Sequence, residues 1–71
     1  METVAIAKNH DRIVGVYYNT TIAEDELARS ETGGKGGYTT YVFVYRIGQA
    51  EADEIYRFDR GTKTLQRHFE D

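Results

Sequence analysis

The sequence predicts an α+β domain in which one short helix packs on a mostly antiparallel sheet of four or five strands, in the order β-β-α-β-β-β. Several short segments alternate β-branched or aromatic residues with small or polar ones, which is typical of strands. One segment between them has the spacing of an amphipathic helix. The chain has 71 residues, which is enough for one domain only. We therefore treat residues 1–71 as a single small domain.

The first two predicted strands form a hairpin. Residues 3–8 alternate apolar with small or polar side chains, and residues 13–18 are rich in Val, Ile and Tyr. The segment 9–12 between them contains Asn and Asp, which hydrogen-bond their own backbone and therefore favour a turn. A glycine inside a strand marks a bulge or a close packing contact, so we expect one of these at Gly15.

Residues 22–30 are predicted to form the helix. Thr21 is followed three residues later by a glutamate, the spacing of a capping box. The acidic run 24–26 would then lie in the first turn, where the helix dipole favours negative charge. Ala23 and Leu27 are four residues apart and form a small apolar face, which we expect to pack on the sheet.

A glycine-rich segment, residues 31–37, follows the helix. Four of the five residues 33–37 are glycine, and ordering them costs much backbone entropy. Lys35 lies among them, but it is followed by glycine and not by the Ser or Thr of a phosphate-binding P-loop. We therefore interpret the segment as a flexible connector.

The remaining strands are residues 38–47, 55–59 and 64–69, the last two joined by a turn at 60–63. The first of them is apolar on both faces, which predicts a central strand. One face carries Val42 and Val44, and the other carries Tyr41, Phe43, Tyr45 and Ile47.

The predicted core is thin, because a chain of this length buries only roughly 60% of its unfolded surface. Its expected members are Val4, Ile6, Ile13 or Val14, Val16, Leu27, Val42, Val44 and Ile55, with some of Phe43, Phe58, Leu65 and Phe69. Disulfides are excluded by the absence of cysteine. One short helix covers only one face of the sheet, so burial of the other face against a second copy is attractive, and a homodimer is one expectation.

The residue types argue against catalysis. A nucleophile needs a base beside it, and Ser30 is the only serine and has no base nearby in the sequence. His10 and His68 are the only histidines, and without thiolates they make a poor metal site. The consecutive acids 24–26 point in different directions on a helix and do not converge on one ion. We expect no enzyme activity, no catalytic residues, no metal and no cofactor.

The C-terminal hairpin, residues 55–69, carries the strongest functional signal. It contains four Arg or Lys residues and one Asp in a chain of net charge −3. Six tyrosines also exceed the needs of a thin core, and Tyr is enriched at protein interfaces. The candidate contact residues are Tyr41, Tyr45, Arg57, Arg60, Lys63 and Arg67.

These residues predict a small protein-binding module, such as a regulator, an inhibitor or an assembly subunit, that acts through an aromatic and basic sheet face. The alternative is a single-stranded nucleic-acid-binding module that uses hairpin 55–69 to stack bases and to contact phosphates. Period-two alternation places Tyr56 and Phe58 opposite Arg57, which favours a core role for those two rings.

The N-terminus lacks the basic and apolar regions of a signal peptide. No apolar run is long enough to span a membrane, so no membrane association is expected. The absence of cysteine fits the cytoplasm, which is the expected location. The chain starts at Met1 and ends without a recognisable tag, and we expect a complete gene product.

Overall fold

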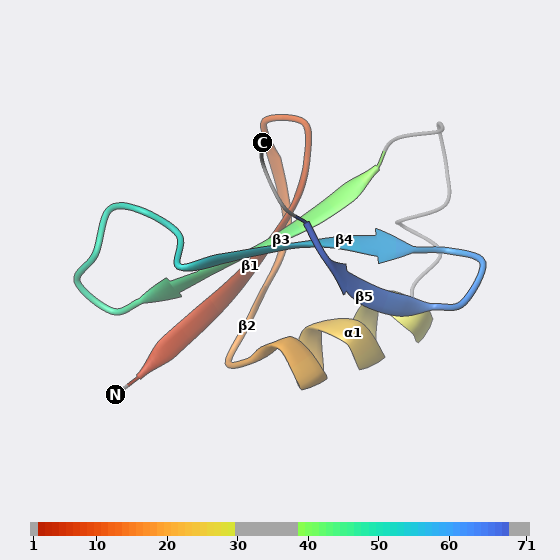
Figure 1. Ribbon diagram of the computed structural model, residues 1–71, viewed down its shortest axis with the longest axis horizontal. Coiled ribbons are helices and arrows are strands. Elements are labelled where there is room, and N and C mark those ends of the chain that lie inside the picture. The colour runs from red at the N-terminus through yellow and green to blue at the C-terminus, as the bar shows by residue number, and fades with distance from the viewer. Residues whose placement is uncertain (1, 30–38, 69–71) are drawn as a thin grey trace.

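The computed structural model describes residues 2–29 and 39–68, and it confirms the predicted α+β class and element order. The predicted flexible loop 31–37 lies outside the described residues. The elements are β1 (Thr3–Asn9), β2 (Arg12–Tyr17), α1 (Thr20–Arg29), β3 (Thr40–Arg46), β4 (Glu54–Asp59) and β5 (Thr64–Arg67), shown in Figure 1.

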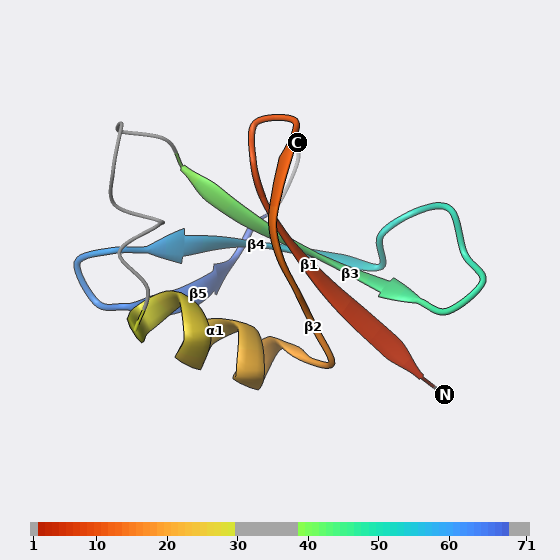
Figure 2. The same ribbon diagram turned by 180° about the vertical axis from the view of Figure 1, so that it is seen from behind.

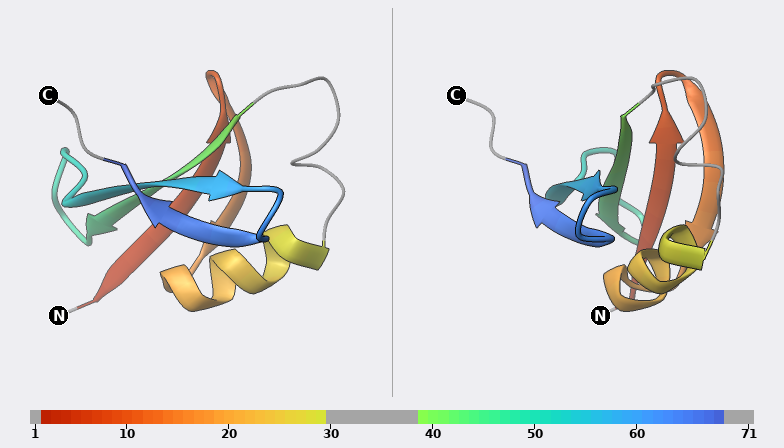
Figure 3. Two further views of the ribbon diagram at one scale, coloured as in Figure 1. Left: turned by 45° about the vertical axis from the view of Figure 1, so that its right-hand side comes forward. Right: turned by 90° about the vertical axis from the view of Figure 1, so that its right-hand side faces the viewer.

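The strands form one five-stranded sheet in the order β2-β1-β3-β4-β5, and every neighbouring pair is antiparallel. Strand β3 is therefore central, as its two apolar faces predict, and β2 and β5 are the edges. Figure 1 and Figure 2 show α1 along one side of this sheet from opposite directions. The helix contacts both edge strands as well as β1 and β3, so the twisted sheet curls around it (Figure 3).

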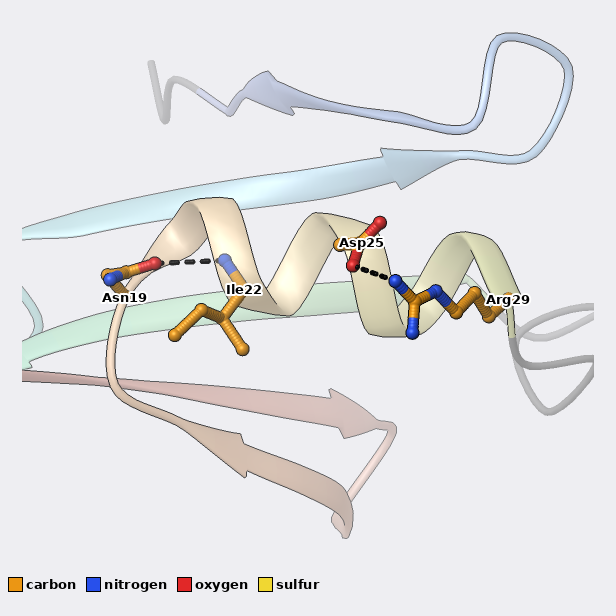
Figure 4. A network of polar contacts seen from close by, with 4 residues as sticks. All are labelled: Asn19, Ile22, Asp25 and Arg29. Atoms are coloured by element: carbon orange, nitrogen blue, oxygen red, sulfur yellow. Dashed lines mark hydrogen bonds and ion pairs between the residues drawn. The ribbon is translucent and has the colours of Figure 1, made fainter.

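Asn19 caps the helix, which begins two residues earlier than predicted. The Ile22 backbone N–H donates to Oδ1 of Asn19 at 2.9 Å, as Figure 4 shows. Asn is among the strongest N-cap residues, and its position directly after β2 sets the start of the helix. The predicted Thr21 capping box is therefore wrong.

The sequence predicted the acidic run 24–26 in the first turn of the helix. Because the helix begins earlier, the run lies beyond the first turn. Asp25 instead pairs with Arg29 one turn later, at 2.7 Å (Figure 4). Glu24 reaches the sheet, where its Oε2 accepts a hydrogen bond from the backbone N–H of Leu65 at 2.8 Å. The helix is thus tied to edge strand β5. Within the described chain, α1 is too short and too polar to cross a membrane.

The core lies between the sheet and α1. Its buried apolar members are Ala5, Ala7, Ala23, Leu27, Val42, Val44 and Phe58, with Val14, Tyr17, Ala28, Tyr56 and Leu65 packed around them. The prediction that Val4 and Ile6 belong to this core is wrong. The register pairs Ala5 with Val44 and Ala7 with Val42. Cross-strand partners share a face, so the small alanines face the helix and the larger side chains face away.

The same alternation removes two further predicted core residues, Val16 and Ile55. Of the predicted alternatives, Val14 packs on the core in place of Ile13, and Phe58 and Leu65 belong to it in place of Phe43. Val16 is 60% exposed and Ile13 is 55% exposed. Ile13 pairs with Lys8, and Val16 pairs with Ile6. Phe43 pairs with both Ile6 and Ile55. All of these side chains lie on the face opposite the helix. Phe69 lies outside the described residues.

Gly15 has both predicted roles. Ala7 pairs with Gly15 while the next residue of β1, Lys8, pairs with Ile13, so Val14 is the extra residue of a β-bulge. The ring of Tyr17 packs directly over Gly15. The bulge and the missing side chain together let Tyr17 fold back onto the core.

Candidate interaction surface

Within residues 2–29 and 39–68, no helix lies on the sheet face opposite α1, and we call it the open face. Since side chains alternate along a strand, the residues next to the buried ones point to this face. Its members in the strands and directly after β5 include Val4, Ile6, Lys8, Ile13, Val16, Tyr41, Phe43, Tyr45, Ile55, Arg57, Asp59, Thr64, Gln66 and His68. The open face thus holds most of the large aliphatic side chains of the strands.

One row of residues across the open face is polar and cationic. The strand registers place Ile13, Lys8, Tyr41, Arg57 and Gln66 side by side from β2 to β5. Apart from Ile13 at its end, every member carries a hydrogen-bond donor, and two of them carry a positive charge. We call this the polar row.

The next row, about 7 Å along the strands, is apolar. It consists of Val16, Ile6, Phe43 and Ile55, which are paired in that order across β2, β1, β3 and β4. His68 extends it to the chain after β5, since its backbone N–H donates to the carbonyl of Ile55 at 2.8 Å. We call this the apolar row, and Val4 and Tyr45 lie paired beyond it.

Two aromatic rings of the open face already have partners. The ammonium of Lys8 lies 5.2 Å from the centroid of the Phe43 ring, within cation–π distance. Tyr41 and His68 meet edge to face across β4, with centroids 5.3 Å apart and an interplanar angle of 70°. These contacts link the polar and apolar rows and occupy ring surface that a stacked ligand would need.

A shallow depression of about 280 Å³ lies beside Arg57 at the β4–β5 turn, lined by Thr39, Arg57, Phe58, Asp59, Arg60 and Gly61. The carboxylate of Asp59 belongs to the β4–β5 turn, where Oδ1 accepts the Gly61 N–H at 2.8 Å. Its other oxygen accepts from Nε2 of Gln66 at 3.2 Å. The guanidinium groups of Arg57 and Arg60 are therefore the unengaged charges of this depression within the described chain.

The structure brings together only part of the predicted contact set. Tyr41, Tyr45 and Arg57 share the open face, and Arg60 lies in the turn at its border. Lys63, in the same turn with a φ of 58°, lines a separate depression beside α1.

Arg67 lies on the other side of the sheet. Its guanidinium carbon is 5.8 Å from the Tyr56 ring centroid, and its Nη1 is 3.7 Å from Glu54. The hydroxyl of Tyr56 donates to Glu54 at 2.8 Å. This hydrogen bond, together with burial, raises the pKa of Tyr56 above its ordinary value. Arg67 thus belongs to a polar cluster on the helix side.

Sequence reasoning missed Lys8 and the apolar row as parts of the surface. Alternation alone groups Lys8 with Ile6, but only the register between β1 and β3 places them beside Tyr41 and Phe43. For metal binding, the described residues contain no group of three or more His, Cys, Asp or Glu side chains that could hold an ion. The chemistry of the surface is apolar contact bordered by cationic hydrogen-bond donors.

Comparison with known proteins adds no relative, because no family model matches the chain and no curated protein or solved structure is significantly similar to it.

Proposed function

We propose that this chain is a small non-enzymatic protein-binding module, acting in the cytoplasm as a regulator, an inhibitor or an assembly subunit. It docks its open face on a partner protein. The observation that carries the proposal is the apolar row, because Val16, Ile6, Phe43 and Ile55 lie on the sheet face that α1 does not cover. Contiguous apolar surface of this kind marks interaction sites in folded proteins.

Burial of this surface supplies the driving force. Val16 and Ile13 are more than half exposed, and Ile6, Phe43 and Ile55 are half-buried. Full burial of one such side chain stabilises by roughly 1.5–3 kcal/mol relative to full exposure. A partner that covers the apolar row therefore gains a useful share of the free energy of a specific complex, before the costs of association.

Single-stranded nucleic acid is the second candidate ligand. Lys8 and Arg57 beside Tyr41 and Phe43 resemble the aromatic and basic faces that stack bases. Two observations rank it lower. Lys8 covers the Phe43 ring and His68 abuts Tyr41, and Arg67 of the basic hairpin lies on the other side of the sheet with Glu54.

A second copy of the chain is a further candidate partner for the same face. A homodimer would bury the apolar row of both copies, and a two-fold dimer is the commonest arrangement of identical chains. Sedimentation of the isolated chain separates this case from binding to a different protein.

Affinity capture from the cells in which the chain is made tests the proposal. The wild-type chain, Val16→Glu on the open face and Ile22→Glu on α1 form a matched set, since both substitutions place one charge at an exposed apolar position. We expect a defined protein to be captured by wild type and Ile22→Glu, to survive nuclease, and to be lost with Val16→Glu. Equal capture by Val16→Glu would contradict the proposal.

A fluorescent thymine 20-mer tests the alternative. Nucleic-acid binding through the polar row would weaken linearly in log affinity against log salt concentration, because counterions are released from the phosphates. We expect no binding by wild type at physiological salt. Salt-dependent binding that Arg57→Glu removes would favour the nucleic-acid function instead.

A further inference from the structure

We propose that the partner of the open face presents an acidic protein surface, with carboxylates opposite the polar row and aliphatic side chains opposite the apolar row. The inference rests on the proposed function and names the chemistry of its partner. The inference is argued from complementarity: a ligand that fits this face has negative charge opposite the polar row and apolar groups opposite the apolar row.

Charge is distributed unevenly over the molecule. The whole chain has a net charge of −3, yet Lys8 and Arg57 give the polar row two positive charges. Several acids lie elsewhere: Asp25 and Glu24 are on the helix, and Asp53 and Glu54 pair with arginines at the other end or face of the sheet. Asp59 shares the open face with Arg57, but its carboxylate is held by the Gly61 amide and by Gln66. An anionic chain that places cations on the sheet face that α1 does not cover is suited to an anionic ligand there.

The cations of the polar row are not neutralised within the described part of the chain. Neither Lys8 nor Arg57 forms an ion pair there. Asp59, the acid nearest to Arg57 in sequence, directs one oxygen to the Gly61 amide and the other to Gln66. Arg57 and Arg60 therefore border the depression at the β4–β5 turn with open donor capacity. A carboxylate accepts such donors in the bidentate geometry that suits arginine.

The apolar row decides what kind of anion fits. Phosphates of a nucleic acid would satisfy Lys8 and Arg57, but bases would meet aliphatic side chains and rings already in contact with Lys8 and His68. A protein surface supplies carboxylates and aliphatic side chains about 7 Å apart, which is the spacing of the two rows.

A second copy fits less well. In the described residues, the acid of the open face that lies beside the polar row, Asp59, is held in its turn, and Glu2 lies beyond Val4 at the far end of β1 from Lys8. Apposed open faces would therefore leave four cations without partners, and uncompensated charge at an interface costs affinity.

Selection of random 16-residue peptides displayed on phage against the full chain tests the inference. We expect enriched peptides to combine Asp or Glu with Leu, Ile, Val or Phe, and amide chemical shifts to map the strongest synthetic peptide to the open face. Lys8→Glu and Arg57→Glu should each weaken that peptide at least tenfold in dissociation constant. Arg29→Glu makes the same charge reversal on α1 and should leave the constant within twofold.

Three results overturn the inference, and they are distinguishable. Enriched peptides without acidic bias that still map to the open face would remove the acidic partner and keep the protein-binding function. Peptides that map elsewhere, or a selection that enriches nothing, would remove both. Binding that is unchanged by Arg57→Glu and Lys8→Glu also contradicts the acidic partner, provided that both variants keep the wild-type amide spectrum.

Discussion

The ring of Tyr17 occupies the space in which a side chain at position 15 would lie. A Cβ built on Gly15 stands 2.5 Å from Cζ and 2.8 Å from Cε2 of Tyr17, far inside van der Waals contact. Across the sheet, Gly15 pairs with Ala7 and Tyr17 with Ala5. The large Tyr17 ring thus packs over a patch of very small residues on the helix side of the sheet. It fills space in the core that these small side chains leave.

Gly15→Ala should lower the free energy of unfolding by about 1–3 kcal/mol, because the rigid Tyr17 ring must leave its place on the core. Urea denaturation measures the change. In a Tyr17→Ala background the same substitution should cost much less, since the clash is gone. An equal cost in both backgrounds would assign the effect to the backbone of β2 and not to the ring.

Asn19→Ala should destabilise the chain by about 1 kcal/mol, because the Ile22 amide loses its cap. Thr21→Ala should change stability by less than about 0.5 kcal/mol, as expected for an exposed helical position. Thermal or urea unfolding of the two variants distinguishes the observed cap from the one that the sequence suggests. A larger cost for Thr21→Ala would contradict the observed helix start.

Glu24→Ala should detach α1 from β5 and lower stability by roughly 1–2 kcal/mol, the range for a partly exposed hydrogen bond to a charged acceptor. Hydrogen exchange gives a local readout, since the Leu65 amide should exchange markedly faster than in wild type. Glu26→Ala, two positions later in the helix, is the control and should leave the Leu65 amide protected. Unchanged Leu65 exchange in Glu24→Ala would rule out this link.

Stability should fall at alkaline pH partly through two tyrosines. The hydrogen bond to Glu54 raises the pKa of Tyr56, and burial followed by the nearby charge of Glu26 raises the pKa of Tyr17. Above about pH 10 the unfolded chain releases protons that the folded chain retains. The contribution of the two tyrosines to the free energy of unfolding is therefore complete below that pH. It is lost as the pH rises through their pKa values in the folded chain.

Urea denaturation between pH 8 and pH 11 measures this loss. Tyr56→Phe should be less stable at neutral pH, because Glu54 loses a donor, and its stability should decline less steeply with pH than that of wild type. Tyr18→Phe, at a position that is 83% exposed, is the control for removal of one tyrosine. A Tyr56→Phe slope equal to that of wild type would contradict the contribution of Tyr56.

The isolated chain should sediment as a monomer at high concentration, because apposed open faces bring like charges together. Tyr45→Glu should then leave the sedimentation coefficient unchanged. A dimer that Tyr45→Glu or Tyr41→Glu dissociates, with a loss of stability, would instead identify the open face as a homodimer interface.

Local chemistry was sufficient to predict the elements. Turn residues flanking β-branched segments located all five strands to within a few residues, because these signals act within a few positions of the chain. The helix start was wrong by two residues because Asn19 and Thr21 are both good caps, and only the end of β2 decides between them.

Which face of a strand is buried could not be predicted from the strand alone. Val4 and Ile6 are more hydrophobic than Ala5 and Ala7, yet pairing with Val42 and Val44 turns the alanines inward. The candidate surface depended on register in the same way. Tyr41 and Tyr45 share a face by alternation alone, whereas the pairing of Arg67 with Tyr56 is set by the β4–β5 turn and places Arg67 on the other side.

The bond between Glu24 and Leu65 has a consequence for the way in which this sheet can grow. A fibril forms when each chain offers two unpaired strand edges, one to the chain above and one to the chain below. In the described chain, one backbone N–H of edge strand β5, that of Leu65, is engaged by the helix carboxylate, and β2 is the other edge. Addition of strands through β2 alone ends at a closed pair. The carboxylate of Glu24 is therefore expected to hinder strand addition at Leu65, at one of the two edges that open-ended polymerisation needs.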